Sequence, residues 1–201
     1  MKRTISFTTG KGSVNNNSRK FHATNIDPER SHLNIEYFNQ NIKDVYHELF
    51  DEALARYNEK QTRNDRRIDD YYEKILSGKQ EKPFYEIIVQ IGDKDNMGAK
   101  TEDGQLAGKI LDEYMKGFQK RNPTLKVFSA HLHMDEATPH LHIDFIPYVT
   151  GSKRGLETRV SLKKALEALG FKGGTRSETE RNQWYAHEKE QKRFRRQQGE
   201  A

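Results

Sequence analysis

The chain has 201 residues, of which 33% are hydrophobic and 32% charged, a balance that predicts a modest core carrying solvated helices. It contains no cysteine, which excludes disulfides, thiolate metal sites and a cysteine nucleophile. The formal net charge of +5 is mild, so an anionic partner must be bound by local clusters of Lys and Arg. No apolar run is typical of a signal peptide or a membrane span, and we expect a cytoplasmic protein.

The N-terminal part of the chain is predicted to contain one strand and two helices. Residues 4–9 are typical of a short strand, and a polar loop rich in Gly, Asn and Ser follows. Residues 27–34 are expected to form a turn. Apolar residues recur at helical spacing over 36–61, and a second helix over 64–78 is predicted to end at Gly78.

The central part of the chain is predicted to alternate between strands and a helix. Residues 83–93 alternate and are rich in β-branched side chains, which indicates a strand, and 103–122 has the pattern of an amphipathic helix. Two strand-like runs, 126–135 and 140–149, are separated by only a few residues and form a predicted hairpin. This order of elements favours an α+β fold built on an antiparallel sheet.

The composition changes after residue 150, where a basic loop, a helix and a Gly-rich stop follow one another. A capping pattern at Ser177–Glu180 then opens a polar, basic helix. We therefore divide the chain into a core, 1–150, which holds the hairpin, and a basic helical extension, 151–201, in the same domain or at its edge.

Four of the eight histidines lie within "HLHMDEATPHLH", residues 131–142, on the two strands of the predicted hairpin. Side chains two apart on a strand point to the same face, so His131 pairs with His133 and His140 with His142. Both pairs share one face when His133 lies opposite His140 or His142. Three imidazoles converging from paired strands form a rigid seat for a metal ion, with positions left open for substrate or water.

The alternatives to a metal site are buried structural histidines or a solvated polar turn. Buried without a metal, four histidines would need several polar partners and would repel one another if protonated. His131 is assigned to the surroundings of the site, because three ligands suffice. At the hairpin tip Asp135 and Glu136 are either turn formers or functional, and Glu136 could reach the metal or position a catalytic group.

The stretch "HMDEATPHLH", residues 133–142, resembles the third motif of the plasmid mobilisation and recombination relaxases of the MobV class (Mob/Pre proteins), which are HUH endonucleases. The N-terminal "SFTTGKGSVNNNSR" and the "IDPERSHLN" that follows also resemble segments of this family. "GLETRVSLKKALEALGFKGG" and "SETERNQW" are similar to Mob proteins of the Bacteroides type, so the resemblance covers most of the chain.

This resemblance implies a five-stranded antiparallel sheet with helices packed on one face and a helical C-terminal extension. It also implies a bacterial enzyme that nicks one strand of origin-of-transfer DNA and forms a covalent 5′-phosphoryl link while freeing a 3′-hydroxyl. By motif position His133, His140 and His142 would hold a divalent ion, Mn²⁺ or Mg²⁺, and Glu136 matches the family's acidic residue. The implied partners are origin DNA, single-stranded and as a hairpin, and the conjugation coupling machinery.

The family's first motif has the form HNxR, in which the histidine is the nucleophile, but this chain has Asn16 at that position. An amide nitrogen is not nucleophilic, because its lone pair is delocalised into the carbonyl. Three explanations compete: a deliberate replacement that holds an uncleaved complex, another nucleophile such as His22 or Tyr185, or a protein that binds its origin without cutting it. Arg19 matches the family's arginine.

Basic residues cluster on both sides of the hairpin and are candidates for phosphate contacts, although any one of them is more often simply solvated. They are Lys11, Arg19, Lys20 and Arg30 before it, and Lys153, Arg154, Arg159, Lys163 and Lys164 after it. The alternative to a nicking enzyme is an origin-binding module with a structural metal. A metal-dependent hydrolase of small molecules fits less well, because apolar residues for a pocket are scarce.

Overall fold

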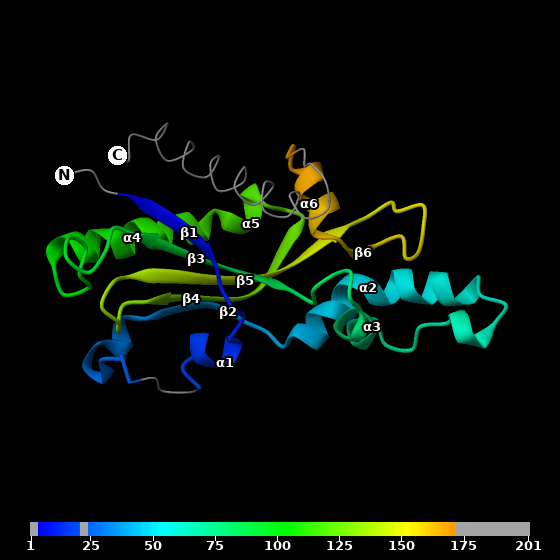
Figure 1. Cartoon of the computed structure of the whole chain (residues 1–201), viewed down its shortest axis with the longest axis horizontal. Helices are drawn as coiled ribbons and strands as arrows, with labels where there is room; N and C mark the ends of the chain where they lie inside the picture. The colour runs from blue at the N-terminus through cyan, green and yellow to red at the C-terminus, as the bar shows by residue number, and fades with distance from the viewer. Residues whose placement is uncertain (1–3, 21–23, 172–201) are drawn as a thin grey trace.

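The computed structural model describes residues 4–20 and 24–171, and Figure 1 shows a long twisted sheet with helices packed against it. The helix predicted from Ser177 onward lies outside the described residues, as do His22 and Tyr185. Within the described ranges no helix combines the length and the apolar character needed to cross a membrane.

The sheet is antiparallel throughout and has the strand order β1-β3-β5-β4-β2. Its strands are β1 (Ile5–Thr9), β2 (Ile35–Asn39), β3 (Tyr85–Ile91), β4 (Leu125–His133) and β5 (His140–Val149). A two-residue strand, β6 (Arg159–Val160), pairs with the end of β5. The predicted α+β class, the antiparallel sheet and the β4–β5 hairpin are therefore confirmed, and the hairpin supplies the central strand β5 and its neighbour β4.

Strand β2 lies where the sequence predicted the start of a helix over 36–61. The helix, α2 (Ile42–Glu59), begins only after Asn41, whose backbone is extended. The Asn41 side chain caps the helix by accepting a hydrogen bond from the Lys43 N–H. Residues before the cap pair with β4 instead, with Ile35 opposite Leu132. The short apolar run is compatible with either period, and pairing with the hairpin decides it.

One face of the sheet is apolar and is covered by α4 (Glu102–Lys116), α5 (Phe118–Arg121) and α6 (Leu162–Ala168). Strand residues of this face include Val89, Leu132, Leu141, Ile143 and Phe145. The helix predicted over 103–122 is divided at Gly117, which caps α4 and precedes α5. This arrangement matches the expected layer of helices on one face, and α6, which follows residue 150, belongs to the same core.

The opposite face is divided along its length. At one end α2 and α3 (Tyr71–Ser77) pack on Phe128 and Ile146 and form a second, smaller core, a layer that the sequence did not predict. A bulge between Val127 and Ser129 shifts the alternation of β4, so that consecutive residues Phe128 and Ser129 both leave the first core. The other end of this face carries the histidines and is free of the α2–α3 layer.

Three short elements complete the described structure. The polar loop after β1 contains α1 (Val14–Asn17), and the predicted turn is the 3-10 helix η1 (Pro28–Leu33). The helix predicted over 64–78 is divided into η2 (Asn64–Arg66) and α3.

Candidate metal centre

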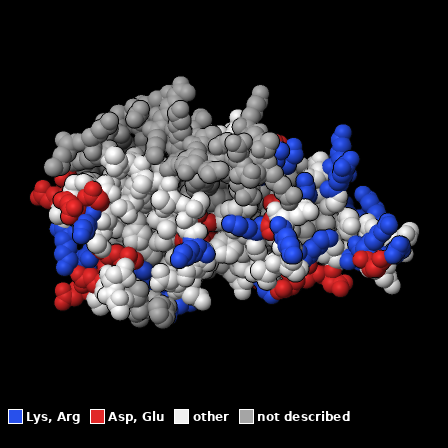
Figure 2. Space-filling model, in the orientation of Figure 1, with Lys and Arg blue, Asp and Glu red and all other residues white. Residues whose placement is uncertain are grey.

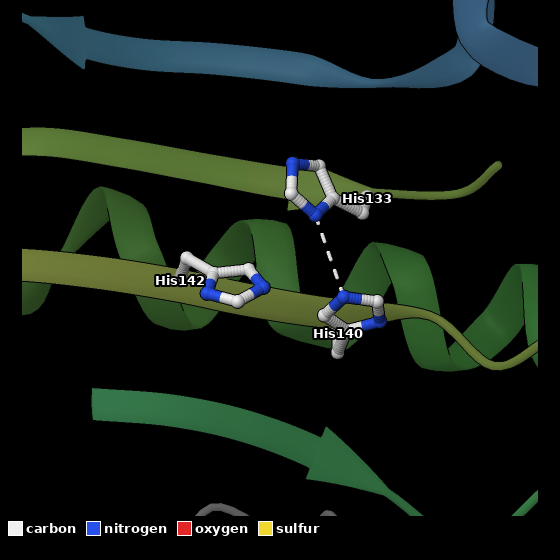
Figure 3. A group of neighbouring side chains, drawn as sticks. All are labelled: His133, His140 and His142. Atoms are coloured by element: carbon white, nitrogen blue, oxygen red, sulfur yellow. Dashed lines mark hydrogen bonds between the residues drawn. The ribbon is translucent and has the colours of Figure 1, made fainter. Parts of the chain in front are cut away.

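The register of the hairpin brings three histidines together. His133 lies directly opposite His140, and His142 lies two residues further along β5 on the same face. One nitrogen from each ring lies within 4.8 Å of the others, and Figure 3 shows the rings converging from β4 and β5. We call these residues the triad. The predicted convergence of three imidazoles from paired strands is present in the structure.

Each ring of the triad is held through its second nitrogen, which fixes its tautomer. The N–H groups are donated from His133 Nε2 to the Asn17 carbonyl (2.8 Å), from His140 Nδ1 to the Thr138 carbonyl (2.8 Å) and from His142 Nδ1 to Glu86 Oε1 (2.6 Å). The nitrogens facing inward, Nδ1 of His133 and Nε2 of His140 and His142, are then bare lone pairs. Two of them, on His133 and His140, lie 3.4 Å apart, a repulsive arrangement that a shared cation relieves.

Protonation of His133 and His140 does not compete with metal binding at neutral pH. Burial, reinforced by the charge of the neighbouring histidines, lowers the pKa of His133 to about 2. Burial also lowers the pKa of His140. Neutral imidazole is the form that ligates a metal, so the donor set fits a divalent ion with three nitrogen ligands.

Glu136 adds a carboxylate at the edge of the triad. Its Oε1 lies 3.7 Å from His140 Nε2 and 4.0 Å from His133 Nδ1. Arg19 Nη2 donates to Oε1 at 2.9 Å and Asn25 Nδ2 donates to Oε2 at 2.7 Å. The Glu136 carboxylate therefore has a fixed position, from which one oxygen can coordinate a bound ion or accept a proton from a reacting atom.

Asp135, the other acidic residue of the tip, is outside the group of three histidines and anchors the tip. Its buried carboxylate accepts from Arg19 Nε at 3.1 Å, Asn34 Nδ2 at 2.6 Å and Ser31 Oγ at 3.2 Å. Burial opposes ionisation, but hydrogen bonds from Arg19 and Asn34 outweigh it and lower the pKa of Asp135. Arg30 donates to the carbonyls of Met134 and Glu136, so the tip is fastened by the segment that contains η1.

A buried carboxylate pair lies behind the triad, and sequence reasoning missed it. Glu86 on β3 is opposite Asp144 on β5, and Asn17 Nδ2 donates to Glu86 Oε1 at 2.7 Å and to Asp144 Oδ2 at 3.3 Å. Burial and the charge of Glu86 raise the pKa of Asp144 to about 7, whereas hydrogen bonds from His142 and Gly12 outweigh burial and lower that of Glu86. The sequence signal that could have predicted this pair was a carboxylate inside an otherwise apolar run, in both β3 and β5.

The remaining predicted residues divide into those near the triad and those far from it. His131 is buried beside it, with Nδ1 3.8 Å from a Glu36 oxygen of β2, and is outside the group of three. Asn16 is half-buried in α1, next to Asn17. Of the predicted DNA contacts, Arg19 and Arg30 hold the tip as described, and Lys11 is exposed.

The predicted contacts after residue 150 lie toward the opposite end of β5. Lys163 and Lys164 both pair with Glu167 within α6, and Arg159 Nε donates to Ser152 Oγ at 3.1 Å. Arg154 is exposed and has no ion pair with any residue in the described ranges. The structure therefore does not bring these residues to the triad.

The chain belongs to the Mob_Pre family of plasmid recombination enzymes, whose family model matches residues 13–200.

Similar solved structures are Mn-bound crystal structures of the MobM relaxase domain (MOBV; Mob_Pre) on plasmid pMV158 oriT DNA. The complex with 22 nucleotides at pH 5.5 has a TM-score of 0.47 and 24% identity over 82% of this chain and 76% of that chain. The complex with 23 nucleotides has a TM-score of 0.40 and 22% identity over 89% of this chain and 96% of that chain. No curated protein sequence matches the chain.

Proposed function

We propose that the protein is a relaxase that binds origin-of-transfer DNA and nicks one strand of it, and that the triad holds the metal ion of the nicking site. The observation that carries this proposal is the pair of bare imidazole nitrogens 3.4 Å apart, with a third imidazole and a carboxylate beside them. His133, His140 and His142 would hold Mn²⁺ or Mg²⁺. When bound, such an ion supplies charge neutralisation and alignment at a scissile phosphate.

The chain's own residues have separate roles around that phosphate. Glu136, fixed by Arg19 and Asn25, supplies an oxygen that can complete the ion's surroundings or accept a proton. A nucleophile on residue 16 would form a bond to the 5′ phosphorus, the bond from phosphorus to the 3′ oxygen would break, and that oxygen would take a proton and leave as a 3′-hydroxyl. Asn16 cannot take this role, because its amide lone pair is delocalised.

We therefore propose that this chain binds origin DNA but nicks it poorly until residue 16 is restored to histidine. The experiment compares Asn16→His with the unaltered protein on a supercoiled plasmid carrying the origin, in the presence of Mn²⁺. Asn15→His, at a neighbouring exposed position, is the matched control. Nicking should rise for Asn16→His alone. If the unaltered protein already nicks, and loses nicking with His22→Ala or Tyr185→Phe, the nucleophile lies elsewhere.

A second candidate function is an origin-binding module whose metal is structural, and the asparagine at position 16 is the observation that favours it. The larger hydrophobic core lies on the face of the sheet opposite the triad, so the fold has a source of stability apart from the site. If the ion is catalytic, EDTA should abolish cleavage by Asn16→His and leave the circular dichroism spectrum unchanged, because this core holds the fold without it. Unfolding by EDTA would instead identify the ion as a structural element.

The surface that would receive the flanking DNA lies at the α2–α3 end. Figure 2 shows Lys and Arg side chains gathered there, mixed with acidic ones. Two hollows of about 500 and 460 Å³ share Gly155 of the β5–β6 loop. Their cationic lining residues are Lys74, Lys79 and Arg159 in one and Arg56, Lys60 and Lys153 in the other. We propose that these residues, together with Arg154, Lys163 and Lys164, contact DNA phosphates, and that Lys11, Arg19 and Arg30 do so near the triad.

A further inference from the structure

The N-terminal segment, residues 10–19, contacts Glu86, the residue that bonds to His142 of the triad, at more than one point. Gly12 N–H donates to Glu86 Oε2 at 2.6 Å, and Asn17 Nδ2 donates to Glu86 Oε1 at 2.7 Å. A Cβ at Gly10 would lie 1.8 Å from Glu86 Oε2, so only glycine lets the backbone approach this carboxylate so closely. The segment therefore wraps around the side chain of Glu86.

The same carboxylate holds one metal ligand, and the same segment holds another. Glu86 Oε1 accepts from His142 Nδ1 at 2.6 Å, and the Asn17 carbonyl accepts from His133 Nε2 at 2.8 Å. A continuous series of hydrogen bonds thus leads from His142 through Glu86 and Asn17 to His133. The lone pair of His133 is therefore set by a contact that exists only while the segment is docked, and that of His142 is set by a carboxylate that the docked segment holds in place.

We infer that Glu86 is a positioning residue that couples docking of the N-terminal segment to metal binding. Docking holds His133 in its ligating tautomer directly and holds Glu86 in the position where it fixes the tautomer of His142. A bound ion in turn holds the two rings where Asn17 and Glu86 bond to them. Because a coupling free energy is reciprocal, the ion must stabilise the docked segment by the same factor by which docking strengthens metal affinity. Asn16 precedes Asn17 directly, so the nucleophile position is ordered with the metal site.

The inference rests on the proposed function only in taking the triad as a metal site. It concerns neither DNA nor cleavage, and its readouts need neither. Mn²⁺ affinity is measured by calorimetry, and amide hydrogen exchange of residues 10–19 is measured with and without Mn²⁺. The unaltered protein should show slower exchange of this segment, including the Gly12 amide, when Mn²⁺ is bound.

Glu86→Gln is the main variant, because it keeps the shape of the side chain and removes its charge. We expect Mn²⁺ affinity to fall 10- to 100-fold, the range typical of partners that orient a ligating histidine, and the metal-induced protection to disappear. Asn15→Ala is the matched control in the same segment, since its exposed side chain makes no hydrogen bond within the described structure, and it should change neither readout.

If Glu86→Gln fails to fold, Asn17→Ala takes its place, because it removes one bond to Glu86 and keeps the carbonyl that His133 uses. It should also weaken both readouts. Unchanged Mn²⁺ affinity in a folded variant, or exchange of residues 10–19 that is indifferent to Mn²⁺ in the unaltered protein, overturns the coupling while leaving the metal site in place. Failure of the unaltered protein to bind Mn²⁺ overturns the site and the coupling together, and failure of nicking alone affects only the proposed reaction.

Discussion

Each imidazole of the triad donates to an acceptor in a different part of the chain: a carbonyl of the N-terminal segment, a carbonyl of the hairpin itself and a carboxylate of β3. Removing one ring should therefore remove a ligand without releasing the other two. The acceptors come from three parts of the chain, so they also tie the geometry of the site to the tertiary fold.

His140→Ala should lower Mn²⁺ affinity by more than the roughly 100-fold upper range seen for residues that merely orient a ligand. The ring is removed directly, so no rearrangement of a neighbour can replace its nitrogen. Calorimetry of Mn²⁺ binding measures the effect. His131→Ala is the control, because this buried histidine lies beside the triad but outside it, and it should bind Mn²⁺ with nearly the affinity of the unaltered protein. Equal losses in the two variants would contradict the assignment of ligands.

Arg19→Ala should reduce the free energy of unfolding by about 3 kcal/mol, because it leaves the fully buried carboxylate of Asp135 without its charged partner. Urea denaturation measures the change. Arg63→Ala also removes an arginine–aspartate pair, but both side chains of that pair are exposed, and it should cost less than about 1 kcal/mol. Comparable costs for the two variants would show that the hairpin tip does not depend on this ion pair.

Residue-level prediction from the sequence succeeded where the signal was local. Alternation on two adjacent strands was enough to place His133, His140 and His142 on one face. It could not find Glu86, because that residue joins the triad only through the pairing of β3 with β5, and strand order is a property of the whole sheet. The ion pair of Arg19 with Asp135 was missed for the same reason: the partners are far apart in sequence.

At the scale of elements, the sequence located the hairpin, β1, β3 and the helices α2, α3, α4 and α6, but not β2 or the packing of α2 and α3 as a second layer. Strand β2 is an edge strand whose large residues Ile35 and Phe38 are partly exposed, so its hydrophobic pattern lacks the alternation of a strand with one buried face. The α2–α3 layer rests on Phe128, which faces it only because of the bulge in β4. Neither β2 nor the bulge therefore produces a regular hydrophobic period in the sequence that could have predicted it.

The α2–α3 layer should be energetically important rather than peripheral. Phe50→Ala should destabilise the protein by about 3–5 kcal/mol, because the side chain is fully buried among the aromatic rings of Tyr46 and Tyr71 and leaves a cavity. Thermal or urea denaturation measures the loss. Leu76→Ala on α3, where the leucine is 53% exposed, should stay within about 0.5 kcal/mol. A small effect of Phe50→Ala would mean that this layer is not part of the cooperative fold.

At the scale of the whole molecule, β5 connects the triad to the basic α2–α3 end. The strand has ten residues, from His140 beside the triad to Val149 beside the β5–β6 loop. At the usual rise per residue this separation is about 30 Å, close to one turn of duplex DNA. A DNA that reaches both places would therefore be held at two points along its length.

Removing charge from the β5–β6 loop should weaken origin binding and its dependence on salt. The double variant Lys153→Gln/Arg154→Gln should reduce the slope of log affinity against log salt by about 0.9 for each duplex phosphate that the loop no longer neutralises. Fluorescence anisotropy with an origin hairpin measures both quantities. Lys109→Gln, an exposed lysine on α4 across the sheet, should leave the slope unchanged. Identical slopes for all three proteins would remove this loop from the DNA surface.

The bulge in β4 gives this strand one position where a change in length leaves the register of the histidines unchanged. Ser129 pairs with Asp144 and Val127 pairs with Phe145, so Phe128 has no paired residue on β5. Deleting it would close the ladder without rotating the residues that follow, whereas an insertion or deletion between Ser129 and His133 would turn His133 into the apolar core. A deletion at residue 128 should therefore weaken the second core, which loses the buried Phe128 side chain, but keep the triad assembled, whereas a one-residue change in length at the five positions after it should abolish metal binding.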